Sequence, residues 1–468
     1  MTEKLSPRIV IVGAGLTGLS LAFRLRQFLP SSSIEILESR NRPGGNIWTA
    51  SRDGFRVEEG PNGFLDSKPS TMQLCCDLGL EQELIPGSEG SRKNRYVFWN
   101  GKLRVLPGSL WSFVTTRLLS VRGKFNLLWE KYRPRPAEPL PDESVAEFVR
   151  RRAGREVATL FADTMVTGIH GGDPELLSMK AAFPRVCQFE REHGSILRGM
   201  TNSARQRRQE AEAKGETYYP PRMWSFRGGM RVLIERLRDS MVDCFRSGVV
   251  IRKVMFDESS NQWEVFGEGQ DRWQADFVIL TCPAPAQALI VADLDPPLAE
   301  QLRQITYNRI AVVALGFKES DCPGKLDGFG YIAPQGLRRD VLGVQWCSSI
   351  FPERAPDGMV LWRALCGGVH RGEMVDWDDD RLTQAVLSEL RIAQGVTGNP
   401  VFRQIVRWPK AIPQYLIGHS ERVANIETKV SRHRNLFLSG NAFHGVAMND
   451  CTEQAEKIAK EIGRRVSI

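Results

Sequence analysis

A glycine-rich turn near the start of the chain constrains the fold more than any other feature. Residues 9–12 form a short, β-branched apolar run typical of a buried parallel strand, and Gly13, Gly15 and Gly18 follow it directly. In such a turn the first glycine allows a sharp bend, the second lets a pyrophosphate approach the backbone, and the third lets helix and strand pack closely. We therefore expect a strand, a phosphate-binding turn and a helix over 16–28.

The segment after this helix indicates a dinucleotide site. A second apolar strand, residues 34–37, ends in Glu38, whose carboxylate can accept hydrogen bonds from a ribose. The doublet Gly44 and Gly45 follows, where the chain would pass back over a long dinucleotide. The small-residue loop 60–63 can lay its backbone flat against a planar ring, and a plain connecting turn is the alternative.

Composition limits the classes of protein to consider. The chain has 468 residues, of which 42% are hydrophobic and 25% charged, which is typical of a globular protein with two or three domains. The net charge of +8 arises from positive residues interspersed with nearly as many acidic ones, so we expect no nucleic-acid partner. Nine cysteines without a Cys-x-x-Cys pair and six histidines without ligand spacing predict neither a disulfide framework nor a metal site.

Residues 104–133 combine an apolar stripe with an excess of positive charge. We expect one helix there, or two helices broken near Gly123. A core-facing helix and a helix lying in a membrane interface explain the stripe equally well, the second because aromatic residues and cations suit anionic lipid. The residues at helical spacing are Trp111, Val114, Leu118, Val121, Phe125, Leu128 and Tyr132.

The α/β pattern returns twice after this stretch. A helix over 231–245 and strands over 249–254 and 277–280 are expected, and the chain closes with a strand over 436–440 and a helix over 452–462. Between these returns, residues 291–425 predict a mixed sheet. The three predicted parts are a discontinuous dinucleotide domain (1–88, 225–290 and 430–468), a substrate domain (89–97, 186–224 and 291–429) and a helical subdomain that could associate with a membrane (98–185).

This organisation resembles the glutathione-reductase-type flavoproteins of the amine oxidase superfamily. It implies an α/β fold with a discontinuous FAD-binding Rossmann domain and non-covalent FAD. Within the superfamily the chain is similar to the oxygen-dependent protoporphyrinogen oxidase family, over essentially its whole length. The segments that carry this similarity are 60–65, 94–97, 171–174, 190–193, 328–330, 351–356, 407–409, 412–415 and 445–451.

The resemblance implies roles for individual residues. Arg95 matches an arginine that binds a substrate propionate, and the macrocycle would lie among Gly168, Ile332, Gln345 and Leu365. No catalytic residue beyond the flavin is implied. Asn46 stands where an arginine is common in the superfamily, and Gln345 stands where a leucine is common. The implied cofactor contacts are Gly13, Ala14, Gly15, Leu16, Thr17, Gly18, Glu38, Ser39, Gly44, Gly45, Gly60, Pro61, Asn62, Gly63, Val254, Asn441, Val446, Ala447 and Met448.

The implied activity is the six-electron oxidation of a porphyrinogen to a porphyrin in heme biosynthesis, with molecular oxygen as acceptor and hydrogen peroxide as product. Protoporphyrinogen IX is the expected substrate and coproporphyrinogen III the alternative. A flavin amine oxidase and a membrane flavoprotein without turnover are more distant alternatives. We expect a cytoplasmic protein, and association with the inner face of the cell membrane and a homodimer both stay open.

Overall fold

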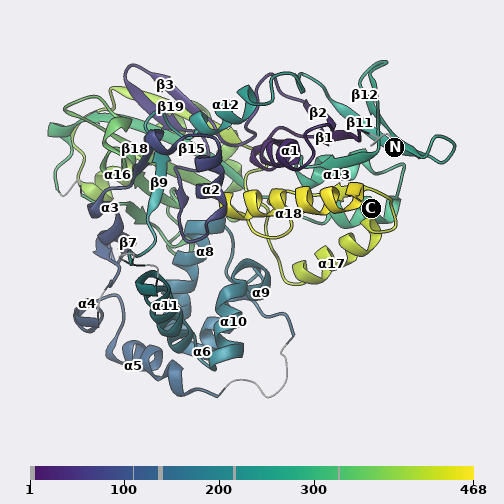
Figure 1. The fold of residues 1–468 in the computed structure, drawn as a ribbon. Helices are drawn as coiled ribbons and strands as arrows, with labels where there is room; N and C mark the ends of the chain where they lie inside the picture. Colours follow the sequence, from purple (N-terminus) through teal and green to yellow (C-terminus); the bar gives the residue numbers. More distant parts are fainter. Residues whose placement is uncertain are drawn as a thin grey trace.

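The computed structural model describes residues 6–108, 110–134, 141–213, 215, 218–324 and 327–467, and it shows an α/β protein with mixed sheets. In Figure 1 the two largest sheets lie in the upper part of the molecule, and helices α4, α5, α6, α10 and α11 gather below them. Helix α8 lies where the helical group meets the sheets.

A five-stranded parallel sheet brings together three distant parts of the sequence, in the order β10-β2-β1-β14-β20. Its strands are apolar because both faces are covered, one by helices and the other by a small antiparallel sheet. The five strands are β1 (Arg8–Val12), β2 (Ser33–Glu38), β10 (Phe245–Ser247), β14 (Phe277–Leu280) and β20 (Leu436–Leu438). The covering elements are α1 (Leu16–Phe28), α12 (Arg231–Asp239), α18 (Met448–Ser467), β11 (Ile251–Asp257), β12 (Gln262–Gly267) and β13 (Arg272–Ala275).

Helix α12 is shorter than the sequence predicts. It ends at Asp239, and two turns then lead to β10, which pairs with the edge of β2. The helical spacing of apolar residues continues past the helix because Met241 and Cys244 are buried from these turns, where the Cys244 amide donates to the Met241 carbonyl. Periodicity alone could not separate a helix from a turn that buries the same face.

A seven-stranded mixed sheet has the order β19-β15-β18-β17-β16-β7-β8, in which only the β16–β7 pair is parallel among the described strands. Helix α16 (Asp379–Gln394) covers one face. Strand β7 crosses the boundary predicted at 97/98, so the sheet extends to Val105. Its strands are β7 (Arg95–Trp99), β8 (Lys102–Val105), β15 (Arg309–Lys318), β16 (Gly330–Ile332), β17 (Gly343–Trp346), β18 (Met359–Gly368) and β19 (Phe402–Trp408).

The smaller elements connect these units. Two short sheets are formed by β3 (Thr49–Arg52) with β4 (Phe55–Glu58), and by β5 (Phe64–Leu65), β9 (Met223–Phe226) and β6 (Leu84–Pro86). The connecting helices are α2 (Ser70–Asp77), α3 (Glu89–Lys93), α9 (Met179–Ala182), α13 (Ala284–Ile290), α14 (Pro296–Arg303), α15 (Cys347–Ile350) and α17 (His419–Val430).

The helical group carries the apolar stripe on α4, on α5 and on the segments that follow each of them. The break lies before α5, at Ser120, whose hydroxyl accepts the Gly123 amide at 3.1 Å, and Gly123 itself lies in the first turn. Leu118 is buried, whereas the other six stripe residues are 45–84% exposed, so a core-facing stripe is wrong for most of its length. The group comprises α4 (Leu110–Thr115), α5 (Val121–Trp129), α6 (Val145–Ala153), α7 (Arg155–Val157), α8 (Asp163–His170), α10 (Pro184–His193) and α11 (Ile196–Ala213).

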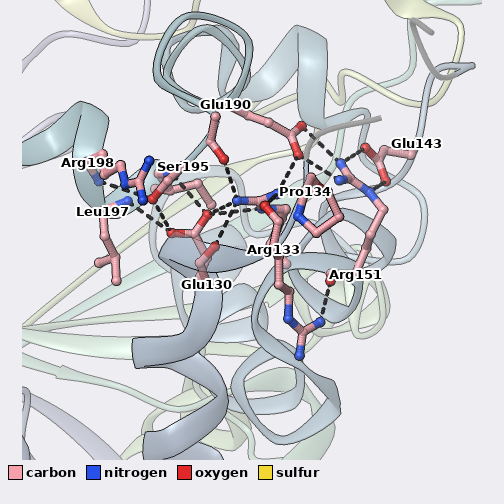
Figure 2. Close-up of polar contacts among 12 residues, drawn as sticks. Glu130, Arg133, Pro134, Glu143, Arg151, Glu190, Ser195, Leu197 and Arg198 are labelled. Atoms are coloured by element: carbon pink, nitrogen blue, oxygen red, sulfur yellow. Dashed lines mark hydrogen bonds and ion pairs between the residues drawn. The ribbon is translucent and has the colours of Figure 1, made fainter. Parts of the chain in front are cut away.

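A buried ion network holds the end of α5 against its neighbours (Figure 2). Glu130 pairs with Arg152 on α6, and both side chains are 1% exposed. The carboxylate also accepts the Ser195 hydroxyl at 2.7 Å and two amides in the first turn of α11. Desolvation opposes ionisation of Glu130, but these hydrogen bonds outweigh it and hold its pKa below the ordinary value. These buried contacts therefore fix the end of α5, and with it the exposed stripe, relative to α6 and α11.

Candidate active site

The glycine turn forms an open cradle at the start of α1. Gly13 has a φ of +107°, and a Cβ there would come within 2.9 Å of the Cys282 amide, so only glycine fits without strain. A Cβ on Gly15 would meet nothing within 4 Å. The turn therefore leaves open space at Gly15, next to the start of α1, where the free amides of a first helical turn suit a phosphate group.

Two predicted segments lie beside this cradle. Gly44 bridges to Gly15, and its amide donates to the Ala14 carbonyl at 2.7 Å. Buried Glu38 accepts the Ala14 amide at 2.8 Å through one oxygen, and the Arg40 amide and Ser39 hydroxyl through the other. A carboxylate can accept about four hydrogen bonds, so Glu38 keeps capacity for a ribose hydroxyl.

The chain from Glu58, the last residue of β4, to Gly63 is called the 58–63 loop here and includes the predicted ring-binding residues 60–63. It contains an unpartnered polar side chain. The Asn62 amide is buried, and neither its nitrogen nor its oxygen has a hydrogen-bond partner among the described residues. A buried amide without partners costs free energy, which indicates that a polar group absent from the protein itself completes the site. The loop is held by the seven-stranded sheet, since Trp408 donates to the Glu59 carbonyl at 2.8 Å.

Buried charges lie behind this loop, and the sequence analysis did not identify them. Arg363 on β18 donates to the carbonyls of Glu58 and Gly60, both at 2.6 Å. Arg354 pairs with the Glu58 carboxylate at 3.2 Å. Desolvation raises the pKa of Glu58, and the nearby guanidinium of Arg354 opposes that shift. A charged residue within an apolar strand such as β18 is a signal that could have marked Arg363.

The segment before α18 is fixed by an aromatic residue that the sequence analysis also missed. The Tyr415 hydroxyl donates to the Asn441 carbonyl at 2.6 Å and accepts the Gly445 amide at 2.9 Å. The Tyr415 ring stacks on His419 with centroids 4.0 Å apart. These contacts define the backbone that leads through Val446 and Ala447 to Met448, the first residue of α18.

Four of the five predicted substrate residues share one face of the seven-stranded sheet, and the fifth, Gly168, is on α8. Register aligns Ile332, Gly343 and Leu365 in one row, and Arg95, Gly330, Gln345 and Arg363 in the row two residues away. Directly opposed residues point to the same face, and so do residues two apart in one strand. A Cβ on Gly168 would lie 2.6 Å from Ile332 Cδ1, so α8 packs closely over this face.

Arg95 stands at the far side of this face from the 58–63 loop. Its side chain is exposed, and its guanidinium lies 5.1 Å from the Phe329 ring centroid. Among the described residues no carboxylate acts on its pKa. Surrounding protein partly desolvates the guanidinium and lowers its pKa, although an arginine stays charged at neutral pH. An accessible cation of this kind can bind an anionic group.

Val254 is placed differently from the prediction. It lies in the middle of β11 rather than at the end of its strand, and its side chain is fully buried in the core. Only its backbone could therefore contact a nucleotide. Asn46 donates to the Ala411 carbonyl at 3.5 Å and brings no charge to the site. No cluster of potential metal ligands occurs among the described residues.

Comparison with known proteins places this geometry in context. The family model described as flavin containing amine oxidoreductase matches residues 16–463. The chain is 31% identical to the chloroplastic protoporphyrinogen oxidase of Nicotiana tabacum, covering 97% of this chain and 85% of that protein. It is 32% identical to the coproporphyrinogen III oxidase of Propionibacterium freudenreichii, covering 97% and 90%. A crystal structure of a candidate protoporphyrinogen oxidase from Exiguobacterium superposes with a TM-score of 0.81 at 25% identity, covering 98% of this chain and 99% of that one.

Proposed function

The chain belongs to the flavin containing amine oxidoreductase family, and from this premise we propose that it oxidises a porphyrinogen to a porphyrin in heme biosynthesis. The observation that carries the proposal is the substrate face, an apolar row beside the 58–63 loop with an accessible guanidinium at its far side. Relatives of similar identity are named for two porphyrinogen substrates, which supports the substrate class.

The cofactor is FAD, held non-covalently. The open cradle at Gly15 would hold the pyrophosphate, Glu38 a ribose hydroxyl, and the Asn62 amide the ring system. When bound, FAD supplies two-electron redox chemistry, so that three turnovers pass six electrons and six protons from one porphyrinogen to three oxygen molecules, giving three hydrogen peroxides. The protein contributes position and exclusion of water rather than an acid or a base.

The substrate face sets the orientation of the macrocycle. Strands β7 and β18 are three strand spacings apart, or about 14 Å, which suits a tetrapyrrole lying across the sheet. Arg95 would hold a propionate at one side while the opposite side of the ring reaches the 58–63 loop. Ile332 and Leu365 would contact the pyrrole rings, and the absence of a side chain at Gly168 lets α8 come close to the same face.

Protoporphyrinogen IX fits this face better than coproporphyrinogen III. Its two propionates lie on one edge of the ring, which matches a cation at one side of an apolar row. Coproporphyrinogen III carries four propionates around the ring, so some would lie against Ile332 and Leu365, where burying a carboxylate is unfavourable. Coproporphyrinogen III stays the second candidate because Propionibacterium and Bacillus relatives bear that name.

The exposed stripe forms a membrane-docking face. Trp111, Val121 and Phe125 are 59–84% exposed, the exposed cation Arg122 follows Val121 in the chain, and Lys131 lies over the ring of Tyr132. An apolar patch flanked by cations suits the headgroup region of an anionic bilayer. Among the helices of the described ranges, none has the length and apolar character of a membrane span.

Turnover tests the proposed activity. Purified yellow protein is incubated aerobically with protoporphyrinogen IX, coproporphyrinogen III or a set of primary amines, with boiled protein as the control for autoxidation. We expect porphyrin fluorescence to rise faster than in the control, with three peroxides formed per porphyrin and a higher kcat/KM for protoporphyrinogen IX. Amine oxidation without porphyrin formation would refute the proposal, and a higher kcat/KM for coproporphyrinogen III would reverse the substrate preference.

A further inference from the structure

One guanidinium connects the substrate face to the predicted flavin loop. Arg363 is 2% exposed and lies on β18 in the same row as Arg95 and Gln345. Its Nη1 donates to the carbonyls of Glu58 and Gly60, both at 2.6 Å, and its Nη2 donates to Gln345 Oε1 at 2.5 Å. The two terminal nitrogens of this arginine thus join the first part of the 58–63 loop to β17, a strand that borders the substrate face.

The charges around this guanidinium do not cancel. The buried charges here are the guanidiniums of Arg363 and Arg354 and the carboxylate of Glu58, which pairs with Arg354. The Glu58 side chain is further occupied by the Thr49 hydroxyl at 2.8 Å and the Met230 amide at 3.0 Å. Two buried guanidiniums against one carboxylate leave an excess of at least one positive charge beside the loop.

The position directly after the glycine doublet is neutral here. Asn46 occupies it and turns its amide toward the Ala411 carbonyl. Its backbone carbonyl packs against Gly60, so it lies at the same loop that Arg363 holds. Arg42, two residues before the doublet, pairs with Glu59 of the loop at 3.2 Å, so these two charges offset each other, and the excess positive charge at this loop comes from the buried guanidiniums.

Building on the proposed function, we propose that Arg363 is a positioning residue that fixes the 58–63 loop against the flavin, and that its charge favours the reduced flavin. Reduction of a flavin adds electron density to the ring, and a fixed positive charge in a desolvated site stabilises that density. Gln345 Oε1 accepts a hydrogen bond from Nη2, the other terminal nitrogen of Arg363, and so keeps the guanidinium turned toward the loop. Gln345 thereby contributes to the part of the site that would hold the flavin.

The reduction potential of the bound FAD tests the charge. It is measured on the holoenzyme without substrate, by slow enzymatic reduction against a reference dye, together with the Kd for FAD. In Arg363→Met we expect the preference for reduced over oxidised flavin to fall about tenfold, or about 30 mV for two electrons, and FAD to bind more weakly. In Arg363→Lys the charge remains but the fork is lost, so the potential should stay near wild type while FAD affinity falls.

Two further variants distinguish an effect of charge on the reduction potential from an effect of misfolding. Gln345→Glu is isosteric and places a carboxylate beside the same guanidinium, so it should lower the potential without removing a hydrogen-bond acceptor. Arg309→Met serves as control, because Arg309 lies in the same sheet but pairs with Asp376 at the surface. An unchanged potential in both Arg363→Met and Gln345→Glu would overturn the charge role, as would an equal shift in the control. Unchanged FAD affinity in both Arg363 variants would overturn the positioning role.

These outcomes are separable from those of the proposed function. The potential is read without any porphyrinogen, so a protein that shows the expected shifts but does not oxidise porphyrinogens would refute only the substrate. A wild-type protein that binds no flavin would overturn both proposals.

Discussion

Replacing Arg95 with alanine should weaken substrate binding while leaving the fold intact. The guanidinium is exposed, and its contact with the Phe329 ring is a cation–π interaction worth about 0.5–1 kcal/mol at such a site. No carboxylate among the described residues would lose its partner, so we expect the melting temperature to change little. A charge-assisted hydrogen bond to a propionate is worth about 1.5–3 kcal/mol, which predicts a KM that rises about ten- to a hundredfold.

Porphyrin fluorescence provides the assay, with initial rates measured over a range of protoporphyrinogen IX concentrations. Arg92→Ala is the matched control, because Arg92 lies three residues earlier, in α3, and pairs with Glu89 at the surface. Its KM should equal the wild-type value. An unchanged KM in Arg95→Ala, or a large loss of thermal stability in that variant, would refute the assignment of Arg95 to the substrate.

Three other predictions follow from the same structure. Glu130→Gln removes the carboxylate of the buried ion network and should lower the free energy of unfolding by about 3 kcal/mol, which would be seen as faster hydrogen exchange in the first turn of α11. Glu175→Gln, in a surface pair, should lower it by less than about 1 kcal/mol. Burial lowers the pKa of His170 to about 4, so the unfolded chain binds a proton that the folded protein excludes, and the contribution of His170 to stability should fall by about 2 kcal/mol between pH 7 and about 5. His170→Gln should make the melting temperature depend less steeply on pH in that range, while buried His419, whose pKa is also lowered to about 4, keeps its own contribution. Replacing Trp111 and Phe125 with serine should reduce co-sedimentation with anionic vesicles without changing turnover in detergent, and equal binding by both proteins would remove the membrane proposal.

Local sequence patterns predicted the cofactor end of the fold well. The helix expected over 16–28 is α1 with the same bounds, because its start is set by the glycine turn itself. The strand expected over 34–37 is the centre of β2, and Glu38 ends it. Such features depend on residues next to one another in the chain, where spacing carries the information.

Features that depend on register between distant strands could not be read in the same way. The cluster of Arg363, Glu58 and Arg354 forms only when β18 meets the loop after β4, some 300 positions away in sequence. The contacts of Tyr415 with Asn441 and His419 likewise arise from folding of the chain. The stripe on α4 and α5 had two equally supported explanations, and exposure decided against the core for six of its seven residues.

The most direct test of the account is reduction of the bound flavin by substrate in the absence of oxygen. Mixing the purified protein anaerobically with protoporphyrinogen IX should bleach the flavin absorbance at a rate at least as fast as kcat, with porphyrin formed as the flavin is reduced. Admitting oxygen should restore the absorbance and release hydrogen peroxide. A flavin that stays oxidised with protoporphyrinogen IX and with coproporphyrinogen III, yet bleaches with an amine, would contradict the central claim.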